Sequence, residues 1–207
     1  MENDRISHYK RSLAVLLKDR SIPRLPITLQ NEEDIYCRLT ALYALEVEQR
    51  GKVFNYDDHT KNRLERITRW LIHSSSRGLI LMGTLGNGKT TMLRAIHDLF
   101  MGYSTMRDAQ TVYNYFKEEN QLLSKNDKLL LLDDLGVEPL RCRIFGEEHH
   151  PLSQLLLSRY DLQRTTIIAT NLSYDEIQNR YGDRVVDRMC ETYEFIRYDT
   201  ESYRRMH

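Results

Sequence analysis

Residues 83–90, with the sequence GTLGNGKT, constrain the fold of this chain more than any other segment. They match the pattern G-x-x-x-x-G-K-[ST] of a phosphate-binding loop. The apolar residues 78–82 before them predict a buried strand, and residues 90–100 after them predict a helix. Backbone N–H groups of such a loop can surround a phosphate at the positive N-terminus of the helix. A glycine-rich turn with a chance Lys-Thr pair would not require this strand and helix.

The side chains of this loop have separate predicted tasks. Lys89 is expected to reach the β- and γ-phosphates of ATP, and the Thr90 hydroxyl is expected to bind Mg²⁺. The predicted nucleotide-binding residues are Gly83, Thr84, Leu85, Gly86, Asn87, Gly88, Lys89, Thr90 and Thr91.

A second motif, KLLLLDDLG at residues 128–136, predicts the strand that completes the metal site. Four consecutive leucines suit a strand that is buried on both faces of a parallel sheet. Two carboxylates follow at its carboxyl end, where α/β sheets place their ligands. Asp133 is expected to hold Mg²⁺ directly or through water, and Asp134 to orient the attacking water. The alternative is a strand that merely ends in an acidic turn.

Two later segments supply further candidates. Residues 165–171 predict a third buried strand, whose tip carries Asn171. Its amide could bond the attacking water or the γ-phosphate, or it could cap the next helix. Arg184 and Arg188 lie four residues apart and share one helix face. That face is either solvated or reaches the nucleotide of a neighbouring subunit.

The N-terminal residues 1–53 predict a small helical region ahead of a core at 54–207. Its first helix, near residues 6–17, carries the basic residues Arg5, Lys10 and Arg11. Its second begins at the N-cap Asn31 and ends at Gly51. The remaining predicted elements are helices at 60–73, 111–123, 152–164, 173–181 and 184–190 (the last capped by Asp183), strands at 103–109 and 193–198, and a polar loop at 137–151.

Composition narrows the class of protein. Lys and Arg number 30 and Asp and Glu number 30, so the whole molecule carries no net charge that would favour nucleic acid. The cysteines lie far apart, which predicts free thiols rather than a metal site. Neighbouring His149 and His150 diverge on a regular backbone and do not predict zinc. No apolar run approaches the roughly 20 residues that span a bilayer, so we expect a cytoplasmic protein without a membrane partner.

The order of these motifs resembles the DnaC/IstB-like branch of AAA+ ATPases, which includes helicase loaders and transposition helper ATPases. The resemblance covers residues 54–205 and depends on the phosphate-binding loop, the LDDLG strand, the ATN strand tip, DRM at 187–189 and SYR at 202–204. It implies a P-loop NTPase fold of AAA+ type, with a parallel sheet flanked by helices. Because few residues follow 198, we expect this chain to lack a full C-terminal lid.

The resemblance also implies roles for single residues. Arg188 matches an arginine finger that acts in trans, with Arg184 as the second candidate, so a homo-oligomer with shared sites is expected. Asn171 matches the sensor 1 position, and Arg204 matches a basic residue of the C-terminal tail. Asp134 stands where most AAA+ proteins have Glu, which predicts slow hydrolysis.

The sequence therefore predicts a Mg²⁺-dependent ATPase of DNA replication or transposition. Its expected partners are a replicative helicase or a transposase, and single-stranded DNA. Two alternatives stay open: an adaptor that binds ATP without hydrolysing it, and a small-molecule P-loop kinase. The absence of an arginine-rich lid and the Asp-Asp pair argue against the kinase.

Overall fold

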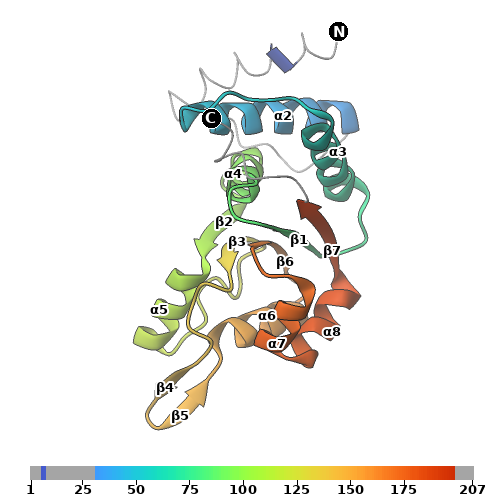
Figure 1. The fold of residues 1–207 in the computed structure, drawn as a ribbon. Coiled ribbons are helices and arrows are strands. Elements are labelled where there is room, and N and C mark those ends of the chain that lie inside the picture. The colour runs from blue at the N-terminus through green and yellow to red at the C-terminus, as the bar shows by residue number, and fades with distance from the viewer. Residues whose placement is uncertain (1–5, 8–30, 199–207) are drawn as a thin grey trace. The chain divides into compact units, whose positions relative to one another are not determined.

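The computed structural model describes residues 6, 7 and 31–198, which fall into two compact units (Figure 1). One unit lies within residues 1–75 and 91–103, and the other within residues 76–90 and 104–207. The predicted first helix is described only at residues 6 and 7, both helical. Arg5, Lys10, Arg11 and Arg204 lie outside the described residues.

The first unit contains α2 (Glu32–Gln49), α3 (Asp58–His73) and most of α4 (Lys89–Leu99). The side-chain oxygen of Asn31 accepts a hydrogen bond from the Glu33 N–H at 3.0 Å, so Asn31 caps α2 as predicted. The helix ends where Gly51 adopts a φ of 69°. Helix α3 begins two residues before its predicted start, because Asp57 caps it by accepting from the Thr60 N–H at 2.7 Å.

The second unit is built on a five-stranded sheet in the order β2-β3-β6-β1-β7, with every neighbouring pair parallel. The strands are β1 (Gly78–Gly83), β2 (Ser104–Asp108), β3 (Leu129–Leu135), β6 (Thr165–Thr170) and β7 (Tyr193–Tyr198). The leucine run of β3 is buried between β2 and β6, as its composition predicts.

Helices α5 (Ala109–Glu119), α6 (Pro151–Asp161), α7 (Tyr174–Tyr181) and α8 (Asp183–Thr192) contribute to the core of this unit. Their apolar side chains, such as Val112, Leu155 and Val186, cluster with Leu130 and Ile168 of the sheet. The predicted α/β architecture is therefore confirmed. One cap was wrong: α8 starts at Asp183 itself, with Gly182 in the N-cap position.

The predicted polar loop at 137–151 contains a hairpin instead, formed by β4 (Cys142–Ile144) and β5 (Glu147–His149). Ile144 pairs with Glu147, so the turn consists of Phe145 and Gly146, whose φ angles are 51° and 88°. Strands of three residues are too short to produce a readable alternation of polar and apolar positions. Figure 1 shows the hairpin projecting from the sheet.

A buried arginine, Arg159, binds the amino end of β6 and the segment before β3. The guanidinium of Arg159 on α6 donates to the Thr166 hydroxyl at 2.8 Å and to the Thr165 carbonyl at 2.6 Å. It also donates to the carbonyls of Ser124 at 2.6 Å and Asp127 at 3.0 Å. Burial lowers the pKa of Arg159 to about 10, so the group stays charged at neutral pH.

We expect Arg159→Met to destabilise the chain by about 3 kcal/mol or more, because each carbonyl left buried without a donor costs about 1–3 kcal/mol. Urea unfolding followed by circular dichroism measures this. The control is Arg143→Met, at an exposed position of β4, which should stay within about 0.5 kcal/mol of the unmodified chain. Equal midpoints for the two variants would contradict the role of Arg159.

Candidate nucleotide-binding site

The strand order brings the predicted site residues to one edge of the sheet. Strand β6 lies between β1 and β3, and the three strands run in the same direction. The phosphate-binding loop follows β1, the Asp133–Asp134 pair ends β3, and Asn171 follows β6. The three motifs therefore meet at the carboxyl ends of adjacent strands, where α/β sheets bind ligands.

The loop has the backbone that a phosphate cradle requires. Gly86 and Gly88 have φ angles of 89° and 86°, which favour glycine. Gly83 is required for space, because an added Cβ would lie 2.6 Å from the Tyr198 carbonyl oxygen. The fully buried Asn87 amide donates to that same carbonyl oxygen at 2.8 Å and to the Thr84 hydroxyl at 3.1 Å. Asn87 therefore fixes the shape of the loop through its side chain.

The ammonium group of Lys89 is held inside the loop. It donates to the carbonyl oxygens of Gly83 at 2.6 Å and Thr84 at 2.8 Å, and the residue is only 5% exposed. A charged ammonium forms stronger hydrogen bonds with an anion than with neutral carbonyls. The position of Lys89 therefore fits a phosphate ligand.

The two predicted magnesium ligands lie side by side. The Thr90 hydroxyl is 3.1 Å from the Asp133 Oδ1 atom, and Asp133 is 7% exposed. The same oxygen accepts from the Asp134 N–H at 3.0 Å, which fixes the orientation of the carboxylate. Hydroxyl and carboxylate oxygens are ligands that Mg²⁺ accepts, with the remaining positions filled by water and phosphate. The donor set therefore fits Mg²⁺.

Asp134 occupies an irregular position in β3. The register with β6 shifts between Leu132 and Leu135, and Asp134 has a φ of 51°. A bulge of this kind changes the direction of a side chain from the one that a regular strand would give it. Left-handed backbone at a non-glycine residue costs about 1–3 kcal/mol and is concentrated at functional sites. The half-buried Asp134 carboxylate thus differs from Asp133 in both backbone and exposure.

Asn171 does not cap the next helix. Ser173 is the N-cap of α7: its hydroxyl accepts from the Glu176 N–H at 3.3 Å, while Glu176 accepts from the Ser173 N–H at 2.7 Å. Asn171 is exposed directly after the tip of β6, so its amide is available for a ligand. Sequence reasoning missed its neighbour Thr170, whose hydroxyl donates to the Leu135 carbonyl at 2.6 Å.

The two candidate finger arginines differ in their surroundings. Arg188 donates to Glu191 at 2.9 Å and lies 4.9 Å from the ring centre of Tyr160. The hydrogen bond to Glu191 raises the pKa of Arg188 above its ordinary value. Arg184 is exposed on the same helix. Action in trans stays a prediction for both residues.

Thr91, the last residue predicted to bind nucleotide, is buried in the first unit. Its hydroxyl accepts a hydrogen bond from the guanidinium of Arg50 at the end of α2. Its side chain is therefore already engaged by the N-terminal helices.

Several solved structures share this fold. DnaI aligns with a TM-score of 0.55 over 73% of this chain and 88% of its own, at 19% identity. A proposed primosome component from Streptococcus pyogenes serotype M3 gives 0.55 over 78% and 87%, at 17% identity. DnaA of Aquifex aeolicus bound to AMPPCP gives 0.51 over 70% and 48%, at 19% identity. The chain thus has the α/β fold of these proteins, and the predicted parallel sheet flanked by helices is confirmed.

No family model matches the sequence. Origin recognition complex subunit 4 of Xenopus laevis is 32% identical over 114 residues, which are 53% of this chain and 25% of that subunit. The chain therefore matches about a quarter of this relative's length. Among the helices that the structure describes, none has the length and apolar composition to cross a membrane.

We expect Lys89→Ala to abolish ATP binding, because the variant loses the ammonium group that is predicted to reach the phosphates. Binding of a fluorescent ATP analogue should weaken by at least about 100-fold, which corresponds to roughly 2.8 kcal/mol. Val53→Ala, at an exposed apolar side chain outside the loop, should bind like the unmodified chain. Unchanged binding by Lys89→Ala would exclude the predicted site.

Proposed function

We propose that this chain binds ATP with Mg²⁺ and hydrolyses it slowly as a helicase loader or a transposition helper ATPase. The single observation that carries the proposal is the contact of Thr90 with Asp133 at 3.1 Å, beside a buried lysine. A structural hydroxyl–carboxylate contact alone would not require Lys89 inside a glycine-rich loop. The fold neighbours of this chain include DnaI and a DnaA bound to AMPPCP.

In the proposed mechanism, Lys89 neutralises the charge that develops on the γ-phosphoryl group. Bound Mg²⁺ would be held by Thr90 and Asp133 and would supply further charge neutralisation at the phosphate oxygens. Asp134 accepts a hydrogen bond from the attacking water and orients it. The Asn171 amide, at the tip of the adjacent strand, holds the water or the γ-phosphate in line.

The active form is proposed to be a homo-oligomer in which α8 of one subunit completes the site of the next. Arg188 is the proposed finger, and Arg184 is the second candidate. Such a finger increases the rate by about 10³–10⁵ in other NTPases. The isolated monomer would therefore hydrolyse ATP poorly, and assembly on a client protein or on DNA would stimulate it.

We expect Arg188→Ala to retain ATP binding and to lose at least about 10³-fold in stimulated hydrolysis. The sharpest measurement mixes this variant with Lys89→Ala. Lys89→Ala subunits would supply the finger, and Arg188→Ala subunits would supply an intact loop, so the mixture should recover activity that neither variant has alone. Wild-type hydrolysis by monomeric Arg188→Ala with saturating DNA would contradict the trans finger.

One observation favours the adaptor as the second candidate function. Arg50, at the end of α2, contacts the hydroxyl of Thr91, the residue directly after the proposed metal ligand Thr90. ATP binding could thereby order the N-terminal region of residues 1–53 for a helicase or transposase without any hydrolysis. A single-turnover assay with DNA and partner present distinguishes the two functions, because an adaptor would leave its bound ATP intact.

Single-stranded DNA is the proposed nucleic-acid partner, and one DnaA neighbour is bound to it. The β4–β5 hairpin supplies the surface. Phe145 at its tip is 97% exposed and has a φ of 51°, a conformation that is unfavourable for a bulky residue. A turn selected for stability alone would carry Asn or Gly there. Aromatic side chains presented in this way stack on unpaired bases.

Two arginines, Arg141 and Arg143, precede this tip in the chain, but their surroundings differ. One nitrogen of the Arg141 guanidinium lies 3.2 Å from each carboxylate oxygen of Glu148. Arg143 is exposed in β4. Stacking by Phe145 with one phosphate contact from Arg143 is therefore the proposed arrangement.

We expect Phe145→Ala to weaken binding of an oligo-dT strand by roughly 5- to 150-fold, since stacking contributes about 1–3 kcal/mol per base. The salt dependence of binding should stay unchanged, because the substitution removes no charge. Fluorescence anisotropy at several salt concentrations measures both quantities. Val137→Ala, at another exposed apolar side chain, is the control. Equal affinities for the two variants would place the DNA elsewhere.

A further inference from the structure

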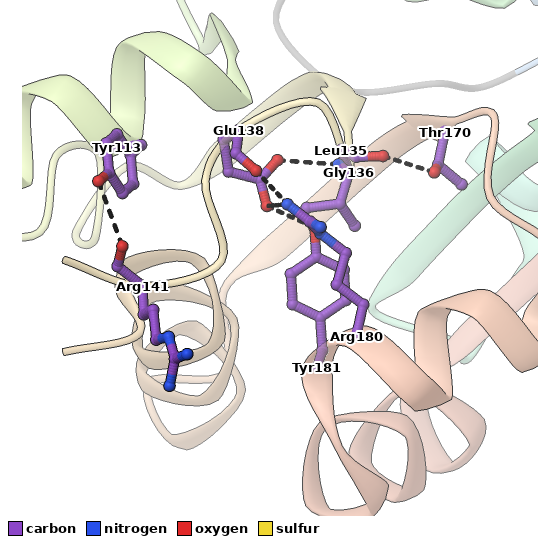
Figure 2. Close-up of polar contacts among 8 residues, drawn as sticks. All are labelled: Tyr113, Leu135, Gly136, Glu138, Arg141, Thr170, Arg180 and Tyr181. Carbon is purple, nitrogen blue, oxygen red and sulfur yellow. Dashed lines mark hydrogen bonds and ion pairs between the residues drawn. The ribbon is translucent and has the colours of Figure 1, made fainter. Parts of the chain in front are cut away.

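A buried carboxylate lies just beyond the catalytic strand, and the mechanism above does not use it. The Glu138 side chain is only 1% exposed. Its carboxylate accepts hydrogen bonds from the Gly136 N–H at 2.8 Å and from the Tyr181 hydroxyl at 2.6 Å. The Arg180 guanidinium lies 3.4 Å from the same carboxylate and also donates to the Glu138 backbone carbonyl (Figure 2).

The partners of Glu138 belong to two distinct elements. Gly136 follows directly after β3, whereas Arg180 and Tyr181 form the last turn of α7. The preceding residue Leu135 makes a parallel connection, because its carbonyl accepts from Thr170 at the tip of β6. Figure 2 shows both connections side by side. Leu135 is thus bonded directly to β6, and Gly136 is connected to α7 through Glu138.

The network is chemically satisfied, which distinguishes it from an accidental burial. Burial raises the pKa of Tyr181 far above its ordinary value, and the Glu138 charge adds to this, so the hydroxyl keeps its proton and donates. Burial alone would lower the pKa of Arg180, but its hydrogen bond with Tyr181 and the charge of Glu138 raise it. A buried carboxylate that loses such partners is strongly destabilising.

The position of α7 gives the network a consequence for the proposed finger. Tyr181 ends α7, and Gly182 alone separates it from Asp183, the first residue of α8. Gly182 has a φ of 84°, and an added Cβ there would meet no atom within 4 Å, so the backbone conformation is what requires glycine. A displacement at Gly136 would therefore pass through the Glu138 carboxylate to Tyr181. From there Gly182 alone connects it to α8, which carries Arg184.

We propose that Glu138 is a positioning residue that couples the end of the catalytic strand β3 to helix α8. This inference rests on the proposed function, because α8 carries the candidate fingers. Nucleotide binding at Asp133 and Asp134 changes the turn at Gly136, and Glu138 transmits that change to the last turn of α7. The same carboxylate then sets where α8 presents its arginines to the next subunit.

A hydrogen bond at the other end of residues 136–141 provides a matched control. The Tyr113 hydroxyl of α5 donates to the Arg141 carbonyl at 3.3 Å (Figure 2). Tyr113→Phe and Tyr181→Phe each remove one phenol hydroxyl that bonds a residue of the segment 136–141. Only the Tyr181 hydroxyl belongs to the connection with α7, so the two variants separate coupling from a general loosening of residues 136–141.

Hydrogen–deuterium exchange of the full chain, with and without Mg²⁺ and ATP, tests the proposal without requiring hydrolysis. In the unmodified chain, ATP should slow exchange in residues 83–90 and change exchange in Asp183–Thr192. Glu138→Gln and Tyr181→Phe should keep the first response and lose the second, whereas Tyr113→Phe should keep both. Stimulated kcat should fall roughly 2- to 30-fold in the two coupling variants, with KM for ATP unchanged.

The outcomes separate cleanly. An α8 response to ATP that survives in both Glu138→Gln and Tyr181→Phe overturns the coupling, as does its absence from an unmodified chain that protects residues 83–90. Equal loss in Tyr113→Phe also overturns it and assigns Glu138 a structural role. If ATP leaves residues 83–90 of the unmodified chain unprotected, the proposed function itself fails and this inference falls with it.

Discussion

Placement of β6 between β1 and β3 is the constraint on which the candidate site depends. All three strands are parallel, so the residue after each strand emerges at the same edge. That arrangement brings Thr90, from the segment after β1, to within 3.1 Å of Asp133 on β3 although 43 residues separate them. It also leaves the tip of β6 between the two motifs. Strand order alone therefore brings the residues of the candidate site together.

Backbone strain is found at the candidate site, near the end of β3. Asp133 keeps its register with Asp108 of β2 and bonds the Thr90 hydroxyl, whereas its neighbour Asp134 adopts a φ of 51° within the register shift against β6. The chain repairs the interrupted ladder with side chains: Thr170 bonds the Leu135 carbonyl, and Glu138 bonds the Gly136 N–H. Two adjacent side chains in a regular strand point to opposite faces, and the bulge releases Asp134 from that alternation.

The sequence predicted those parts of the molecule that a strong local pattern of residues determines. Four leucines and the run at 78–82 identified buried strands, and the glycine pattern identified the loop. The hairpin was missed because its strands have three residues each. Glu138 was missed for a different reason: glutamate is almost never fully buried, and its partners Arg180 and Tyr181 lie more than forty residues away. Only tertiary structure joins such groups.

Assembly would also have to compete with contacts inside one subunit. Arg188 already bonds Glu191 and lies over Tyr160. Exposed pairs of this kind contribute little to stability, because water screens them and both side chains lose freedom. A nucleotide phosphate at a subunit interface offers the guanidinium a more highly charged acceptor with two-oxygen geometry. These intramolecular contacts of Arg188 therefore offer only weak competition to the phosphate. The exposed Arg184 faces no such competition, so the two arginines could act at different stages of assembly.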